Sequence, residues 1–147
     1  MKIQDVMTQN PRCVTPDMAA RDAAQMMKDE NVGILPVVDN ESSRRLIGVI
    51  TDRDIALRIV AEGRGVDTSV SEVMSKSRLA TCLPSEDIDT VMDTMAAEQV
   101  RRIPIVDERG ALVGIVSQAD VVLKANNDRK AEQTVERISA PGGQHSS

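Results

Sequence analysis

The sequence contains no phenylalanine, tyrosine or tryptophan, and this absence excludes several kinds of binding site. Proteins that bind single-stranded nucleic acids stack the bases on aromatic rings, and proteins that bind methylated amines enclose them in aromatic cages. Neither surface can be built here, so a bound base would have to lie between aliphatic side chains. The core must consist of Val, Ile, Leu, Met and Ala, with the eight methionines filling gaps.

Basic charge and long apolar runs are also scarce. The 147 residues carry 18 Lys and Arg against 23 Asp and Glu, a formal net charge of −5, which argues against a general nucleic-acid surface. No apolar run reaches the roughly 18 residues that a membrane span needs. The first residues also lack the apolar stretch of a signal peptide. We therefore expect a cytoplasmic protein without membrane contact.

Few residues could carry catalysis or hold a metal. Two cysteines, Cys13 and Cys82, and a single His145 in a polar tail make a poor set of zinc ligands. In a reducing compartment both thiols are expected to be small buried residues, with a disulfide or redox switch as the alternative. No Ser–His–Asp or Cys–His set is available either. We expect no enzyme, no metal site and no obligatory cofactor.

An internal repeat organises the chain. Leu-Pro-Val-Val-Asp at 35–39 returns as Ile-Pro-Ile-Val-Asp at 103–107, and Gly-Val-Ile-Thr-Asp-Arg-Asp at 48–54 returns as Gly-Ile-Val-Ser-Gln-Ala-Asp at 114–120. Val-Met-Thr at 6–8 likewise returns as Val-Met-Ser at 73–75. The shift varies between 66 and 68 residues because the loops differ in length. We assign 1–61 to the first repeat, 62–72 to a linker, 73–125 to the second repeat and 126–147 to a charged helix and disordered tail.

Each repeat is expected to fold as β-α-β-β-α. A proline, Pro16 or Pro84, follows a short strand and suits a helix start. Apolar residues at helical spacing then predict a helix, and two strands joined by a polar turn predict a hairpin. The expected strands are 12–15, 34–38 and 46–51, then 79–83, 102–106 and 112–117; the expected apolar helix positions are Ala20, Ala23, Ala24 and Met27, then Ile88, Val91, Met92 and Met95. Because about 55 residues bury little surface alone, the two repeats should pack as one pseudo-symmetric α/β domain.

The pattern Gly-x-x-Thr/Ser-x-x-Asp occurs twice where a strand ends and a helix begins. Its hydroxyl and carboxylate, Thr51 with Asp54 and Ser117 with Asp120, could simply form a capping box. Aspartate is one methylene shorter than glutamate, so we expect it to reach the cap poorly and to point outward, where it could accept two hydrogen bonds from a cis-diol such as ribose. The helix N-terminus could meet a phosphate. The glycine that opens each motif would let a ligand approach the backbone.

Two arginines distinguish the second repeat. Arg101 and Arg102 stand where the first repeat has Gly33 and Ile34. A guanidinium offers fixed, bidentate donors to phosphate, although a solvated surface pair is the alternative. Adjacent residues on a strand point to opposite faces, so we expect one of the two to face a given ligand.

These motifs, in this order and in two copies, resemble a tandem pair of CBS (cystathionine beta-synthase) domains. This Bateman module, in its stand-alone bacterial form, matches about residues 3–125. The resemblance implies two repeats packed through their sheets around a pseudo-twofold axis. It also implies clefts between them that take AMP, ADP, ATP or S-adenosylmethionine as a regulatory ligand. A homodimer and an unidentified regulated protein are the implied partners.

The resemblance also implies which residues bind the ligand. The motif aspartates would hold ribose hydroxyls, the Thr or Ser would hold ribose or phosphate, and the arginines would hold phosphate. The expected ligand-binding residues are Thr51, Asp54, Ser117, Asp120, Arg101, Arg102, Thr15, Val14, Ile34, Leu35, Pro36, Ile103 and Pro104. Because Gly33 and Ile34 depart from the basic pattern, we expect one of the two sites to bind phosphate weakly or to be empty.

Two other functions use the same residues differently. In a ligand-free scaffold the motif aspartates would be caps only, and the protein would act through dimerisation or through its C-terminal helix, where Ala131, Val135 and Ile138 share one side. Nucleic-acid binding through the arginines would show a steep salt dependence, and the acidic total charge disfavours it.

Overall fold

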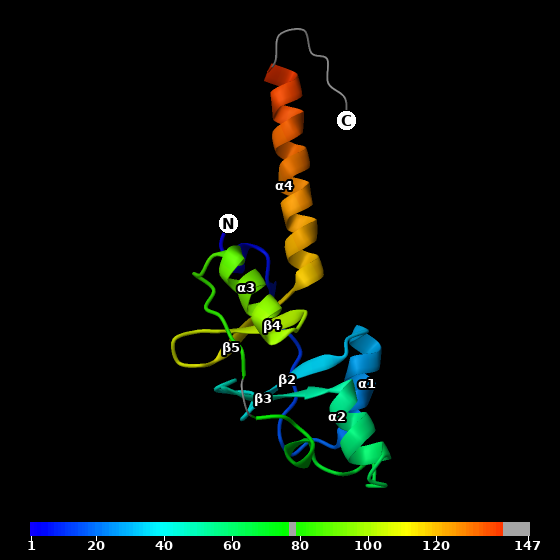
Figure 1. Ribbon diagram of the computed structural model, residues 1–147. Coiled ribbons are helices and arrows are strands. Elements are labelled where there is room, and N and C mark those ends of the chain that lie inside the picture. Colours follow the sequence, from blue (N-terminus) through cyan, green and yellow to red (C-terminus); the bar gives the residue numbers. More distant parts are fainter. Residues whose placement is uncertain (77–78, 140–147) are drawn as a thin grey trace.

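The structure is a computed structural model that describes residues 1–76 and 79–139, with side chains described up to residue 128. Two units of similar architecture follow one another along the chain (Figure 1). The first contains α1 (Ala20–Glu30), β2 (Ile34–Val38), β3 (Leu46–Thr51) and α2 (Asp52–Ile55), which continues as the π-helical turn η2 (Ala56–Val60). The second contains α3 (Ile88–Glu98), β4 (Arg102–Val106), β5 (Leu112–Ser117) and α4 (Gln118–Ser139). Short elements precede each unit: η1 (Ile3–Asp5) and β1 (Thr8–Gln9), and then η3 (Val70–Glu72).

Both predicted hairpins are confirmed, and they share one register. Strand β2 pairs antiparallel with β3, so that Ile34 lies opposite Thr51. Strand β4 pairs with β5 in the same way, so that Arg102 lies opposite Ser117. The register therefore places position 34 or 102 beside the residue that caps the following helix.

The helices after the prolines begin later than the sequence suggested. Pro16 lies in a turn closed by a hydrogen bond from Met18 N to Thr15 O at 3.2 Å, and Pro84 lies in the same kind of turn. Proline fixes φ near the value required at the second position of such a turn, so it starts the turn rather than the helix. The helices begin four residues further on. Their predicted apolar faces are confirmed: the buried residues are Ala20, Ala23 and Met27 in α1, and Val91 and Met95 in α3.

The strands expected at 12–15 and 79–83 are reduced to single bridges. Val14 forms an isolated parallel bridge with Val37, and Cys82 forms the equivalent bridge with Ile105. A turn follows each bridge almost at once, which leaves no room for a longer ladder.

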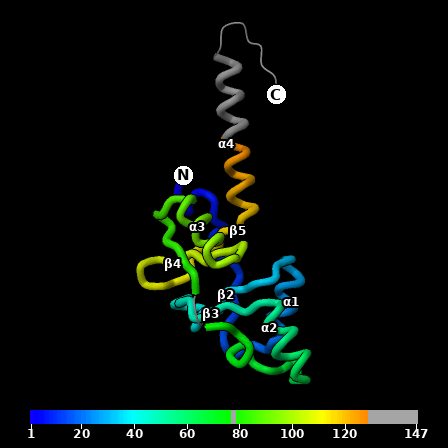
Figure 2. The backbone as a smooth tube through the Cα atoms, viewed as in Figure 1, coloured from blue at the N-terminus to red at the C-terminus, as the bar shows by residue number. Residues whose placement is uncertain are grey.

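The two hydrophobic cores are completed crosswise, which means that each core includes residues from a segment that the sequence assigned outside that repeat. The first core contains α1, β2 and β3 residues together with Val70, Val73 and Met74, which come later in the chain. The second core contains Ile3 from the N-terminal segment, with Val6 and Met7 packed against it. Strand β1 correspondingly pairs with β5, and Ser75 bridges Val49 of β3. Figure 2 shows the blue N-terminal segment beside the second unit and the green segment before residue 77 beside the first.

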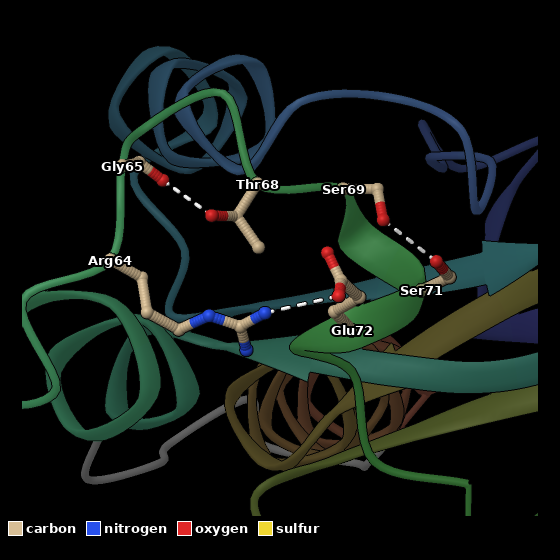
Figure 3. Close-up of polar contacts among 6 residues, drawn as sticks. All are labelled: Arg64, Gly65, Thr68, Ser69, Ser71 and Glu72. Carbon is tan, nitrogen blue, oxygen red and sulfur yellow. Dashed lines mark hydrogen bonds and ion pairs between the residues drawn. The ribbon is translucent and has the colours of Figure 1, made fainter.

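Polar contacts stabilise the stretch that the sequence assigned to a linker. Arg64 forms an ion pair with Glu72 at 3.0 Å, and Thr68 donates a hydrogen bond to the Gly65 carbonyl at 2.6 Å (Figure 3). The Ser69 and Ser71 hydroxyls lie 2.8 Å apart. These contacts hold the chain in position just before Val70 enters the first core.

Candidate functional site

Both Gly-x-x-Thr/Ser-x-x-Asp motifs form closed capping boxes. The Thr51 amide donates to Asp54 Oδ2 at 3.0 Å, and the Asp54 amide donates to Thr51 Oγ1 at 3.0 Å. In the second motif the corresponding bonds between Ser117 and Asp120 are 3.3 and 3.0 Å long. The expectation that aspartate is too short to reach the cap is therefore wrong. Each carboxylate accepts the cap hydrogen bond at Oδ2. The partners of Oδ1 therefore determine whether the carboxylate can also accept a hydrogen bond from a ligand.

The two carboxylates differ at this second oxygen. Asp54 Oδ1 accepts a hydrogen bond from Ser75 Oγ at 3.3 Å. Thr8 is the repeat equivalent of Ser75, and within the described part of the chain Asp120 Oδ1 accepts no such bond from it. Thr8 and Asp120 instead both line a cavity between the units.

The motif glycines make room for the protein itself, which corrects the expectation that they make room for a ligand. A Cβ at Gly48 would lie 2.7 Å from the Ser75 carbonyl oxygen. A Cβ at Gly114 would lie 2.5 Å from the Met7 sulfur and 3.1 Å from the Thr8 carbonyl oxygen. The absence of a side chain at each glycine thus lets the segment that completes the core lie against the strand.

A cavity of about 250 Å³, here called cleft 1, opens between the two units. From the second unit, Arg102, Ser117 and Asp120 supply a guanidinium, a hydroxyl and a carboxylate. The first unit supplies an apolar wall that includes Ile34 and Leu35. The other lining residues are Thr8, Pro11, Arg12, Glu30, Val32, Pro36 and Ile115. Six residues predicted from the sequence therefore meet in one place.

A second cavity of about 240 Å³, here called cleft 2, is built from equivalent positions. It is lined by Ile34, Val49, Leu79, Ala80, Glu98, Val100, Arg102, Ile103 and Pro104. Each of these is the repeat equivalent of a residue that lines cleft 1. The equivalents of the polar residues Ser117, Asp120 and Thr8 do not line it. They are Thr51, Asp54 and Ser75, and the Ser75 hydroxyl donates a hydrogen bond to Asp54 Oδ1.

Among the described residues, the charged side chains are distributed unequally between the two clefts. In cleft 1, Arg12 Nη1 lies 3.0 Å from Glu30 Oε1, and the two side chains are 54% and 41% exposed. Cleft 2 has Glu98 at the position of Glu30 but Ala80 at the position of Arg12. Arg102 is half-buried and lines both clefts, as does its repeat equivalent Ile34.

The remaining predicted site residues lie elsewhere. Arg101 is exposed and lines neither cleft, and Val14 is fully buried in the first core. Thr15 borders a separate hollow and donates a hydrogen bond to Asp17 at 2.6 Å, which lowers the pKa of that carboxyl group. Arg12 and Glu30, which also line cleft 1, are not among the residues predicted from the sequence. Aligning the repeats would have drawn attention to the equivalent Glu30 and Glu98.

The cysteines lie apart from both clefts. Both are free thiols, with Cys82 buried and Cys13 half-buried, and burial raises the pKa of each. The described residues include no group of three or more His, Cys, Asp or Glu that could hold a metal ion. Within the same residues, none of the helices is long and apolar enough to cross a membrane.

Two β-α-β-β-α-like units with equivalent clefts between them define a pseudo-symmetric tandem-repeat module. The family model for the CBS domain matches residues 3–61 and 70–126, so the chain belongs to the CBS domain family and carries a pair of these domains. It is 40% identical over 137 residues to the CBS domain-containing protein YhcV of Bacillus subtilis, which covers 93% of this chain and 94% of that protein.

Solved structures confirm the predicted fold class. CBSX2 in complex with AMP is 26% identical, with a TM-score of 0.72 over 87% of this chain and 98% of that one. The CBS domain pair of protein MJ0100, in complex with 5-methylthioadenosine and S-adenosyl-L-methionine, is 25% identical, with a TM-score of 0.73 over the same shares of the two chains.

Proposed function

We propose that this chain is a regulatory, non-catalytic module that binds an adenosyl ligand, such as AMP, ADP, ATP or S-adenosylmethionine, in cleft 1. The observation that carries the proposal is the meeting of Asp120, Ser117 and Arg102 from one unit with an apolar wall from the other. These groups suit the ribose, phosphate and base of one small molecule. Two structures of CBS pairs with adenosyl ligands support the same class of ligand.

Each residue would have a distinct role in the bound state. Asp120 uses Oδ2 for its helix cap, so Oδ1 is the oxygen that would accept a ribose hydroxyl. Arg102 would donate to a phosphate, since a guanidinium forms strong charge-assisted hydrogen bonds with it. Adenine would lie against Ile34 and Leu35, because the chain has no aromatic ring on which it could stack.

Cleft 2 would bind the same ligand more weakly. The motif carboxylate of the first unit, Asp54, does not line this cleft, and it already accepts hydrogen bonds within the protein at both oxygens. A ligand in cleft 2 would therefore lack the carboxylate that Asp120 offers in cleft 1. The sequence led to the expectation of one weak or empty site for another reason, the replacement of the arginines by Gly33 and Ile34, but Ile34 and Arg102 each line both clefts.

Isothermal titration calorimetry on the full chain tests the proposal with AMP, ADP, ATP and S-adenosylmethionine, and GMP serves as a control with the same sugar and phosphate. Saturable heat with at least one of the four adenosyl ligands is expected. No heat with any of them at millimolar concentration would overturn the proposal and favour the scaffold alternative.

We also propose that the chain forms a homodimer through its helices. Leu57 and Val60 on the α2–η2 segment are 48% and 73% exposed, and Val122 and Leu123 on the equivalent α4 are 49% and 62% exposed. Exposed apolar side chains on equivalent helices of both units suit an interface between two copies of the chain. Light scattering after size exclusion should give a dimer, and Leu57→Glu with Leu123→Glu should give a monomer. Val66→Glu, at another exposed apolar position, should leave the mass unchanged.

A further inference from the structure

The Arg12–Glu30 ion pair belongs to cleft 1 but has no assigned role in holding a ligand. Both side chains line the cavity, and both are about half-exposed. Glu30 is the last residue of α1, and Arg12 precedes the bridge at Val14, so two different elements supply the pair. An exposed ion pair stabilises a fold only slightly, which leaves room for another role.

The charges that line cleft 1 cancel. Arg12 and Arg102 contribute two positive charges, and Glu30 and Asp120 contribute two negative charges. Arg12 is already engaged by Glu30, whereas Arg102 makes no ion pair with any residue that the structure describes. A ligand with one phosphate group can therefore use Arg102 without disturbing another contact.

Additional phosphate groups would meet a different environment. They would add negative charge to a small cavity that also holds the Glu30 carboxylate, and like charges repel at this range. Arg12 could donate to them through its other N–H groups, but its charge is already partly compensated by the Glu30 carboxylate, which lies 3.0 Å from Arg12 Nη1. Building on the proposed function, we infer that the Arg12–Glu30 pair sets the phosphate-number preference of cleft 1, with Glu30 disfavouring di- and triphosphates relative to a monophosphate.

The test is the ratio of the dissociation constants for ATP and AMP, measured by calorimetry on the full chain without divalent cations. Glu30→Gln removes the repelling charge and frees Arg12, so the ratio should fall by about fivefold. Arg12→Gln leaves Glu30 uncompensated, so the ratio should rise by about fivefold. If the ion pair had only a structural role, the two variants would not shift the ratio in opposite directions. Opposite shifts therefore distinguish the proposed role from a structural one.

Glu98→Gln is the matched control. It changes the charge of the whole protein by the same amount, but in cleft 2, where Ala80 replaces the arginine. Because cleft 1 is the tighter site, the ratio of the dissociation constants measured for that site should stay within about twofold of the wild type. All three positions are partly or fully exposed, and we expect each variant to melt within about 2 °C of the wild type.

The outcomes are distinct. If Glu30→Gln and Arg12→Gln move the ratio in the same direction, or Glu98→Gln moves it as far as Glu30→Gln, the inference is overturned while adenosyl binding stands. The same holds if Glu30→Gln leaves the ratio unchanged. If neither the wild type nor any variant binds AMP or ATP, the inference fails, and the proposed function fails with it only if ADP and S-adenosylmethionine also give no heat.

Discussion

Cleft 1 and cleft 2 are built from equivalent backbone positions, but their polar groups face different partners. The carboxylate of Asp54 does not line cleft 2, and it accepts hydrogen bonds within the protein from Thr51 and Ser75. In cleft 1 the equivalent Asp120 faces the cavity together with Thr8. The comparison shows that a duplicated backbone can retain its shape while a few side chains decide which copy can bind a ligand.

The largest effect is expected from the two motif carboxylates. Asp120→Asn should weaken AMP binding by about thirtyfold, because an amide has one acceptor oxygen and cannot accept both the Ser117 amide at the helix cap and a ribose hydroxyl. Asp54→Asn should weaken it by less than about threefold, because Asp54 hydrogen-bonds within the protein. Calorimetry on the two variants measures both values. Equal losses would show that the clefts contribute equally.

The neighbouring arginines give the next comparison. Arg102→Met should weaken AMP binding by about tenfold, the value of one charge-assisted hydrogen bond. Arg101→Met is the control and should change it by less than about twofold, since Arg101 lines neither cleft. A larger effect at Arg101 would mean that the phosphate lies on the opposite face of β4.

Alanine substitutions at the motif glycines Gly48 and Gly114 compare how tightly the two core-completing segments are held against the strands. Gly48→Ala should lower the free energy of unfolding by about 2 kcal/mol, because its Cβ would meet the Ser75 backbone oxygen. Gly114→Ala should cost about 1 kcal/mol, since the closest atom is the movable Met7 sulfur. Urea unfolding provides the measurement. The reverse order would show that the N-terminal segment is held more tightly than the segment before residue 77.

The smallest effect concerns the loop that is longer in the first repeat. The Ser43 hydroxyl donates to Asp39, and this bond is the main reason that the pKa of the carboxyl group is lowered. A lowered pKa stabilises the fold above the unfolded-state pKa, and this contribution disappears as the pH falls through the folded-state value. Ser43→Ala should raise the pKa of Asp39 toward its usual value. An NMR titration that shows no change would contradict this account.

The repeat allowed much of the fold to be predicted. The two hairpins and the buried faces of α1 and α3 followed from the apolar spacing and the polar turns, because hairpins and amphipathic helices depend on local pattern. The contacts between side chains could not be predicted from the local sequence pattern. Asp54 bonding to Ser75 and Arg12 pairing with Glu30 both join segments that are distant in sequence, and only the packed chain brings them together.

The crosswise cores also determine the order in which the chain can fold during synthesis. The first core cannot close until Met74 has left the ribosome, and the second core joins Ile3 to Val121 near the opposite end of the described chain. Contacts between such distant segments slow folding. The two repeats should therefore fold as one cooperative unit after most of the chain has been made. A break between them should produce two fragments that acquire structure only when mixed.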